Sequence, residues 1–198
     1  MALTYSKQNA SNPTTPGAKA PPFRLKSTDD QWVTLDTFSD KKALLIIFMC
    51  NHCPYVIAVQ DRLNAIAKKY AEQTVSVVGI NPNDSTRYPD DSFEEMKKRT
   101  ESGQIQFTYL VDETQAVAKA YDAVCTPDLY LYENVAGEFR LRYHGRIDDN
   151  WKESEKVTKR ELENAIDQIL KNPTLAPTEL KFIESTPSMG CSIKWKSA

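Results

Sequence analysis

The sequence predicts an α/β domain in which a central mixed β-sheet is flanked by helices. Residues 43–48 form an unbroken apolar run, which is typical of a strand buried on both faces of a sheet. Behind this run, apolar side chains recur at the spacing of one helix face, at Val56, Val59, Leu63, Ile66 and Tyr70. Strand and helix patterns then keep alternating along the chain, as they do where helices cover a sheet.

The remaining elements are expected in order along the chain. Two short alternating segments, 21–25 and 32–35, lie on either side of an Asp-Asp turn and predict an N-terminal β-hairpin. Ser92 and Glu95 have the spacing of a capping box, so a helix is expected to begin there. Further strands are predicted at residues 75–80, 107–111, 129–132 and 139–143, and further helices at 114–121 and 162–170.

Length and composition favour one domain with an extension at each end. The chain has 198 residues, of which 40% are hydrophobic and 26% charged, and this is enough for one full core. Residues 1–20 are rich in Ser, Thr, Asn and Pro and predict a flexible arm. We expect the domain to span residues 21–172 and the tail, 173–198, to pack on it.

Charge and hydropathy limit the classes of partner and the location. A net charge of −2 gives no reason to expect nucleic acid or an anionic membrane as a partner. No apolar run has the length of a membrane span, and the first residues contain no apolar segment of signal-peptide length. These features predict a cytoplasmic protein. In that reducing compartment, cysteines are more often catalytic or metal-binding than joined in structural disulfides.

A Cys-x-x-Cys pair, Cys50 and Cys53, lies where the buried strand ends and the helix begins. The helix dipole and the unpaired N–H groups of a first turn favour a thiolate over a thiol. We expect Cys50, the outer cysteine, to be the nucleophile and Cys53, inside the first turn, to resolve the mixed disulfide. His52 lies between them and can donate a hydrogen bond or charge to the Cys50 sulfur. A structural zinc knuckle would need a second ligand pair, which the chain lacks.

Two other stretches contain cysteines. In VCTPDLYLY, Cys125, Thr126 and Pro127 come directly before an apolar strand. Cys125 has three interpretations: a resolving thiol, a metal ligand, or a small buried hydrophobe. The tail ends in PSMGCSIKWK, where apolar Ile193 and Trp195 are expected to dock on the domain. Docking can bring Cys191 near Cys50 or Cys125; the alternative is a short edge strand with an inert thiol.

The strand, Cys-x-x-Cys and helix resemble the active site of the thioredoxin superfamily. With FMCNHCPYV, CTPDLYLYE, GRIDD and the terminal PSMGCSIKWK, the chain resembles the peroxiredoxin-like, AhpC/TSA-related redoxins with a CNHCPYV signature. This resemblance implies a thioredoxin-like fold, thiol or disulfide substrates, recycling by an unidentified reductase and no cofactor, and it allows a homo-oligomer. It also implies that the Thr126–Pro127 bond is cis and faces the Cys-x-x-Cys pair, with Thr126 and Pro127 in supporting roles.

The sequence departs from the family in ways that bear on activity. Peroxiredoxins carry a Pro-x-x-x-Thr-x-x-Cys pattern, which is missing here: Ala43 and Ile47 hold the Pro and Thr positions if Cys50 is aligned, and Ile46 and Cys50 hold them if Cys53 is aligned. Peroxidase activity is therefore doubtful. Thioredoxin's buried Asp, six residues before the first cysteine, is replaced by Leu44.

Three functions follow as hypotheses. The first is a thiol–disulfide oxidoreductase in which Cys50 attacks and Cys53 resolves. The second is an antioxidant thiol peroxidase with Cys50 as the peroxidatic cysteine. The third is a zinc- or copper-binding module built from Cys50, Cys53, Cys125 and either Cys191 or His52. The first is preferred, so no metal ligand is assigned.

Overall fold

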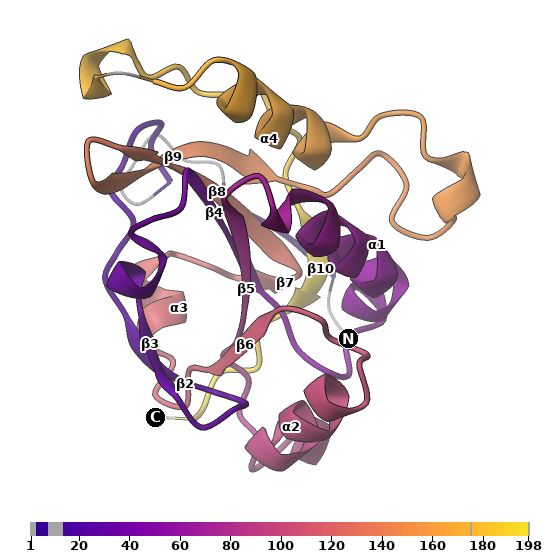
Figure 1. Cartoon of the computed structure of the whole chain (residues 1–198). Helices are drawn as coiled ribbons and strands as arrows, with labels where there is room; N and C mark the ends of the chain where they lie inside the picture. The colour runs from indigo at the N-terminus through magenta and orange to yellow at the C-terminus, as the bar shows by residue number, and fades with distance from the viewer. Residues whose placement is uncertain (1–2, 8–13, 175, 198) are drawn as a thin grey trace.

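The structure is a computed structural model that describes residues 3–7, 14–174 and 176–197. Across these residues, the main sheet contains seven strands and a smaller sheet contains three (Figure 1). In the order β3-β2-β6-β5-β4-β8-β9, the main-sheet strands are Trp32–Thr34, Arg24–Ser27, Thr108–Val111, Val75–Asn81, Ala43–Phe48, Asp128–Val135 and Glu138–Gly145. In the order β1-β10-β7, the small-sheet strands are Leu3–Tyr5, Met189–Ser192 and Cys125–Thr126.

The main sheet is mixed, as predicted, and β4 lies inside it. β4 pairs in parallel with β5 and antiparallel with β8. Its side chains alternate between two apolar clusters: Leu45 and Ile47 pack on one face of the sheet, and Leu44 and Ile46 pack on the other. All six residues of β4 are buried. This confirms the prediction of a strand buried on both faces.

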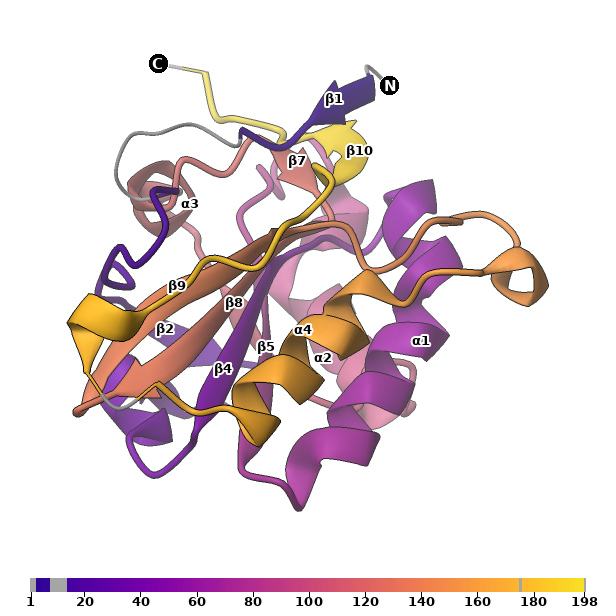
Figure 2. The ribbon, with the colours of Figure 1, turned by 90° about the horizontal axis from the view of Figure 1, so that it is seen from above.

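Helices cover both faces of the sheet (Figure 2). The helices are α1 (Pro54–Ala71), α2 (Phe93–Glu101), α3 (Ala116–Ala120) and α4 (Glu161–Lys171), and short 3-10 helices lie at Leu35–Phe38, Pro89–Asp91, Ser154–Lys156 and Pro177–Glu179. Buried residues of α1, α2 and α4 join the cluster that contains Leu45, and those of α3 join the cluster that contains Leu44. Both faces of the sheet are thus shielded from water.

Local sequence signals account for several element ends. Ser92 Oγ accepts a hydrogen bond from the Glu95 N–H at 3.4 Å, which confirms Ser92 as the N-cap of α2. The β8–β9 hairpin turns through Ala136 and Gly137, whose φ angles of 53° and 85° are both in the left-handed region that such turns require.

The two ends of the chain meet in the small sheet. β10 lies between β1 and β7 and runs antiparallel to both. Leu3–Tyr5 therefore form a strand, although the sequence predicts a flexible arm for residues 1–20. Part of that arm, residues 1–2 and 8–13, lies outside the described residues. Figure 2 shows the small sheet at the end of the main sheet where α1 begins.

Among the described residues, no helix combines the length and hydropathy needed to cross a membrane.

Candidate active site

The Cys-x-x-Cys pair lies where β4 ends and α1 begins, as predicted. Cys50 lies in the connecting turn, and Cys53 is the N-cap residue of α1. The prediction that Cys53 is inside the first turn is wrong, because Pro54 takes the first helical position. Proline is favoured there, since the N–H that it lacks would have no partner within the helix. The positive end of the helix dipole is therefore at Cys53.

The fold buries both sulfurs. Cys50 is 1% exposed and Cys53 is 0% exposed. Exposure therefore does not distinguish Cys50 as the outer cysteine of the pair. Both cysteines belong to the apolar cluster that also contains Leu129, Ile147 and Cys191. Thiols buried in this way react with a partner only if a covering segment moves or if the attacking group is small.

The two thiols differ in acidity. The pKa of Cys53 is lowered to about 5, mainly because the Cys50 thiol donates a hydrogen bond to its sulfur, and further because Thr126 and the Val56 backbone N–H interact with it. The pKa of Cys50 is raised well above its ordinary value by its hydrogen bond to Cys53, by burial and by the negative charge of Asp91. The two thiols therefore titrate as one pair, in which the proton on one sulfur stabilises a thiolate on the other. The start of α1 favours the negative charge at Cys53, whereas the Thr126 carbonyl oxygen, 3.1 Å away, opposes it there.

A buried carboxylate organises the loop that contains Cys50. Asp91 Oδ1 accepts a hydrogen bond from the Asn51 backbone N–H at 2.7 Å. Asp91 Oδ2 accepts from His52 Nδ1 at 2.7 Å and from Asn83 Nδ2 at 2.8 Å. The His52 ring stacks on Tyr88, with centroids 5.3 Å apart and an interplanar angle of 6°. These contacts hold the partly exposed His52 ring against Asp91 and Tyr88.

Asp91 and Tyr88 were missed at the level of sequence. They lie in the polar loop after β5, for which surface exposure is the simplest expectation. The length of this loop is the one sequence feature that points to a role at the site, since long loops in compact domains are often functional. Nothing in the spacing shows that Asp91 turns inward to Asn51 and His52, because that contact joins residues 39 and 40 positions apart.

On the other side of the thiols lies β7. The Thr126–Pro127 bond is cis, as the resemblance implies. Thr126 Oγ1 is 3.5 Å from Cys50 Sγ, and the Thr126 carbonyl oxygen is 3.1 Å from Cys53 Sγ, where the protonated thiol can donate to it. The structure therefore brings Thr126 and the Cys-x-x-Cys pair together.

The other two cysteines lie in adjacent strands of the small sheet. All four cysteines are in the described part of the chain, and none forms a disulfide in this structure. Cys125 Sγ is 3.8 Å from the Pro127 carbonyl oxygen, and the pKa of Cys125 is raised by burial and by the charge of Asp128. Cys191, in β10, pairs with Thr126 in the antiparallel register. The tail thus brings Cys191 to the Cys-x-x-Cys pair.

A histidine and a carboxylate form a second buried pair directly after Pro127. His144 Nε2 is 2.8 Å from Asp128 Oδ1, and the His144 ring stacks on Tyr130 at 4.0 Å between centroids. A histidine at the end of a predicted strand is expected at the surface, but His144 is fully buried. The cause is the pairing of β8 with β9, which places His144 opposite Tyr130.

One group of side chains near the site has metal-binding chemistry. The nearest ligand atoms of Cys50, His52 and Asp91 all lie within 4.8 Å of one another. Sulfur, imidazole nitrogen and carboxylate oxygen together suit Zn²⁺. However, the Asp91 oxygens already accept three hydrogen bonds, which favours a structural role for this carboxylate. The structure does not place Cys125 or Cys191 in this group.

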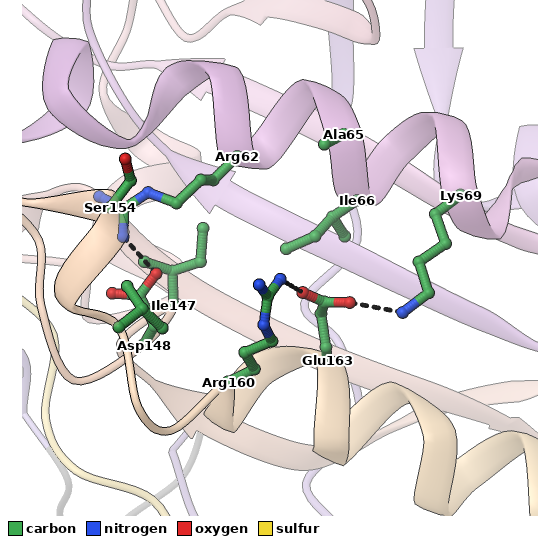
Figure 3. Close-up of a pocket in the computed structure, with 10 residues that line it drawn as sticks. Arg62, Ala65, Ile66, Lys69, Ile147, Asp148, Ser154, Arg160 and Glu163 are labelled. Atoms are coloured by element: carbon green, nitrogen blue, oxygen red, sulfur yellow. Dashed lines mark hydrogen bonds and ion pairs between the residues drawn. The ribbon is translucent and has the colours of Figure 1, made fainter.

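Among the cavities lined by described residues, two include side chains of α1. A cavity of about 220 Å³ next to Pro127 is lined by Tyr55 and Trp151, whose rings are 4.3 Å apart, and by Met189 of β10. A second cavity, of about 350 Å³, lies between α1 and α4, away from the cysteines (Figure 3). Its charged side chains point toward one another and form ion pairs: Arg62 with Asp148, and Glu163 with both Lys69 and Arg160.

Comparison with known proteins agrees with this geometry. The model of the AhpC/TSA family matches residues 16–151. A Helicobacter pylori protein, provisionally named peroxiredoxin bcp, is 25% identical over 119 residues, which cover 60% of this chain and 73% of that protein.

Solved structures of two proteins without an assigned activity are similar over nearly the whole chain. An uncharacterised conserved protein from Geobacillus kaustophilus is 40% identical with a TM-score of 0.84, covering 100% of this chain and 98% of that one. A hypothetical protein from Sinorhizobium meliloti is 38% identical with a TM-score of 0.83, covering 95% and 98%. Thiol:disulfide interchange and peroxidoxin structures match at 19% and 15% identity with TM-scores of 0.60 and 0.53, and these show the fold alone.

The fold is thioredoxin-like, and a buried Cys-x-x-Cys pair lies at the start of its first long helix. The family model covers more than two thirds of the chain, including both cysteines of the pair and the Thr126–Pro127 step. Together these findings make the protein a thioredoxin-like oxidoreductase, and the chain belongs to the AhpC/TSA family.

Proposed function

We propose that the protein is a thiol–disulfide oxidoreductase in which Cys53 is the attacking thiolate and Cys50 the resolving thiol. The observation that supports this order of roles is the position of Cys53 as the N-cap of α1, with a pKa of about 5. Sequence reasoning alone favours the opposite order, because the first cysteine of such a pair is usually the outer one. Here Pro54 shifts the helix start, and burial removes the distinction between outer and inner.

The reaction is written as two exchanges. The Cys53 thiolate attacks one sulfur of a substrate disulfide, forms a mixed disulfide and releases the other substrate sulfur as a thiolate. Cys50 loses its proton and attacks the Cys53 sulfur, which releases the second substrate thiol and leaves a Cys50–Cys53 disulfide. The substrate gains two electrons and the protein loses two. A reductase of dithiol or glutathione type is needed to restore the protein.

Hydrogen bonding prepares Cys50 for the second exchange. While Cys53 is a thiolate, the Cys50 proton stabilises it, and this contact is the main reason for the raised pKa of Cys50. Once Cys53 is bound in a mixed disulfide, its negative charge is gone. Cys50 then becomes more acidic at the moment when a thiolate is needed, because the thiolate is the nucleophilic form.

The test compares two matched variants, Cys53→Ser and Cys50→Ser, with glutathione disulfide as the probe. Cys53→Ser is expected to lower the rate of mixed-disulfide formation, because burial and the charge of Asp91 still raise the pKa of the remaining Cys50 thiol after the contribution of Cys53 is lost. Cys50→Ser is expected still to react with glutathione disulfide at Cys53, since the serine hydroxyl can still donate to the thiolate. Adducts on Cys50 in Cys53→Ser, with an unreactive Cys50→Ser, would assign the roles in the opposite order.

A thiol peroxidase is the second candidate, and the same Cys53 thiolate supports it. The family membership and the similarity to a protein provisionally named a peroxiredoxin favour this activity. The residues that orient a peroxide in the family do not match, since Ile46 and Cys50 hold the Pro and Thr positions relative to Cys53. Stopped-flow oxidation with hydrogen peroxide distinguishes the two: exchange with disulfides much faster than oxidation by peroxide supports the first.

The third hypothesis, a zinc- or copper-binding module, is tested by measuring the metal content of the purified protein. Metal analysis of protein purified without chelator reports on the Cys50, His52 and Asp91 group. A stoichiometric metal that is lost in His52→Ala would favour the metal-binding function over the redox one. Cytoplasmic location and self-association stay predictions.

A further inference from the structure

The C-terminal strand β10 lies directly over the reactive thiols. It pairs antiparallel with β7, with Cys191 opposite Thr126 and Ser192 opposite Cys125. The Thr126 carbonyl oxygen is the atom 3.1 Å from Cys53 Sγ. β10 therefore lies alongside β7, the short strand that faces the Cys-x-x-Cys pair. Figure 2 shows β10 between β1 and β7, at the start of α1.

The fit between β10 and β7 depends on a glycine. A Cβ atom placed on Gly190 would lie 1.9 Å from the Thr126 carbonyl oxygen and 2.5 Å from the Thr126 carbonyl carbon. Both are backbone atoms, which cannot swing away as a long side chain can. Only glycine allows this approach, and it brings the next residue, Cys191, to the level of Cys53.

Cys191 is part of the thiol cluster. It is 2% exposed and belongs to the same buried cluster as Cys50 and Cys53. The pKa of Cys191 is raised to about 12, first by burial and then by its hydrogen bond to Cys53, while the positive charge of Lys194 opposes the shift. The interaction is reciprocal, since Cys191 is one of the groups that lower the pKa of Cys53.

Contacts on both sides of Cys191 hold the strand in register. After it, Ile193 N–H donates to the Val124 carbonyl at 3.0 Å, and Lys194 N–H donates to Asn83 Oδ1 at 2.9 Å. Before it, Ser188 N–H donates to Ser6 Oγ at 2.8 Å. The position of the Cys191 thiol is therefore fixed by the fold and does not depend on chance encounters of a loose tail.

We propose that Cys191 is a second resolving thiol of this redox centre, able to form a disulfide with Cys53. This inference rests on the proposed function, because it needs a mixed disulfide on Cys53. In the step, Cys191 gives up its proton and attacks the Cys53 sulfur. The Cys53–Cys191 bond forms, the bond from Cys53 to the substrate sulfur breaks, and the substrate leaves as a thiol. The two electrons gained by the substrate come from Cys53 and Cys191.

The same change of charge that activates Cys50 also acts on Cys191. When Cys53 is in a mixed disulfide, it no longer accepts a hydrogen bond from Cys191 as a thiolate, whereas Lys194 stays on β10 through its hydrogen bonds to the Ser192 carbonyl and hydroxyl. The two resolving thiols come from different elements: Cys50 lies between β4 and α1, and Cys191 lies in β10, between β1 and β7.

The experiment follows the fate of one equivalent of glutathione disulfide added to the fully reduced protein. Samples are quenched with acid, alkylated and mapped by peptide mass spectrometry. The variants are Cys50→Ser, Cys50→Ser/Cys191→Ser and, as a matched control, Cys50→Ser/Cys125→Ala. Cys125 is the suitable control because it lies on the adjacent strand and is also buried, but its sulfur faces the Pro127 carbonyl.

We expect Cys50→Ser to form a Cys53–Cys191 disulfide with release of both glutathione thiols, and the Cys125 control to do the same. Cys50→Ser/Cys191→Ser should stop at the glutathione adduct of Cys53 and so release one glutathione thiol per protein, where Cys50→Ser releases two. An adduct that persists equally with and without Cys191 would overturn the inference and leave the proposed function standing. Failure of Cys53 to acquire glutathione in any variant would overturn both.

Discussion

Cys50 and Cys53 are three residues apart in one buried cluster, yet their surroundings differ. Cys50 faces Asp91, whose charge disfavours a second negative charge. Cys53 faces the start of α1 and the Thr126 segment, on which β10 lies. The proposed function therefore assigns the protonated thiol to Cys50 and the thiolate to Cys53. On this proposal the surroundings of each cysteine, rather than its order along the chain, assign the roles.

The largest effect is expected from Gly190→Ala, which tests the cover over the Cys53 side. The added Cβ meets backbone atoms, so β10 must shift away from β7. Overpacking of this kind costs about 1–3 kcal/mol. We expect alkylation of Cys53 by iodoacetamide to accelerate at least ~10-fold, because the sulfur is 0% exposed in the wild type.

Gly103→Ala is the control for this experiment. Gly103 has a positive φ of 74°, and a Cβ there would meet nothing within 4 Å. Its cost is backbone strain far from the thiols. Equal acceleration in both variants would mean that general loosening, and not the displacement of β10, exposes Cys53.

Asp91→Asn tests the other side of the comparison by removing the charge beside Cys50. The pKa of Cys50 should fall, because one cause of its rise is gone. Labelling at Cys50 relative to Cys53 should increase several-fold. Loss of the acceptor for His52 or Asn83 should also cost about 1–3 kcal/mol of stability. The neighbouring acid Asp90, which is exposed, gives the control Asp90→Asn, for which the labelling ratio should not change.

A smaller effect is expected in the pH dependence of stability. The pKa of Cys53 is about 5 in the folded protein and about 8.5 in an unfolded chain. A lowered pKa stabilises the fold fully above the unfolded value, and this contribution is lost as the pH falls toward the folded value. The difference in unfolding free energy between the wild type and Cys53→Ser should therefore shrink between about pH 8.5 and pH 5 in urea titrations. A difference that grows as the pH falls would contradict a Cys53 thiolate.

The smallest effect is expected in the cavity between α1 and α4. Lys69→Met removes one of the two partners of Glu163 (Figure 3). Half-exposed ion pairs of this kind contribute about 0.2–1 kcal/mol, so the change in unfolding free energy should fall in that range. The rate of glutathione exchange should not change. A large decrease in the rate of glutathione exchange would show that this cavity affects the thiols, and would contradict their separation.

Much of the fold is predictable from local patterns. The run at residues 43–48, the helical spacing behind it and the Ser92 cap each depend on neighbouring residues, and the structure confirms them. The mixed sheet with a long helix after the cysteines follows from the same patterns. The placement of the two cysteines between strand and helix was also within reach.

What the sequence could not provide are the contacts between distant segments. Asp91 turns in to His52, and Cys191 reaches Thr126 across 65 positions through the pairing of β10 with β7. The order of roles in the Cys-x-x-Cys pair stays a prediction, and the proposed order differs from it for a local reason: Pro54 can be interpreted either as part of the turn or as the first helical residue. Burial of His144 likewise depends on a strand pairing that its own neighbours do not reveal.

The most direct test of the central claim is partial alkylation of the reduced wild-type protein with iodoacetamide at about pH 6, where an ordinary thiol is almost wholly protonated. Peptide mass spectrometry then shows which cysteine has reacted. A Cys53 thiolate predicts modification at Cys53, while Cys50, Cys125 and Cys191 stay unmodified. Modification mainly at Cys50 would contradict the assignment and restore the order that the sequence alone suggests.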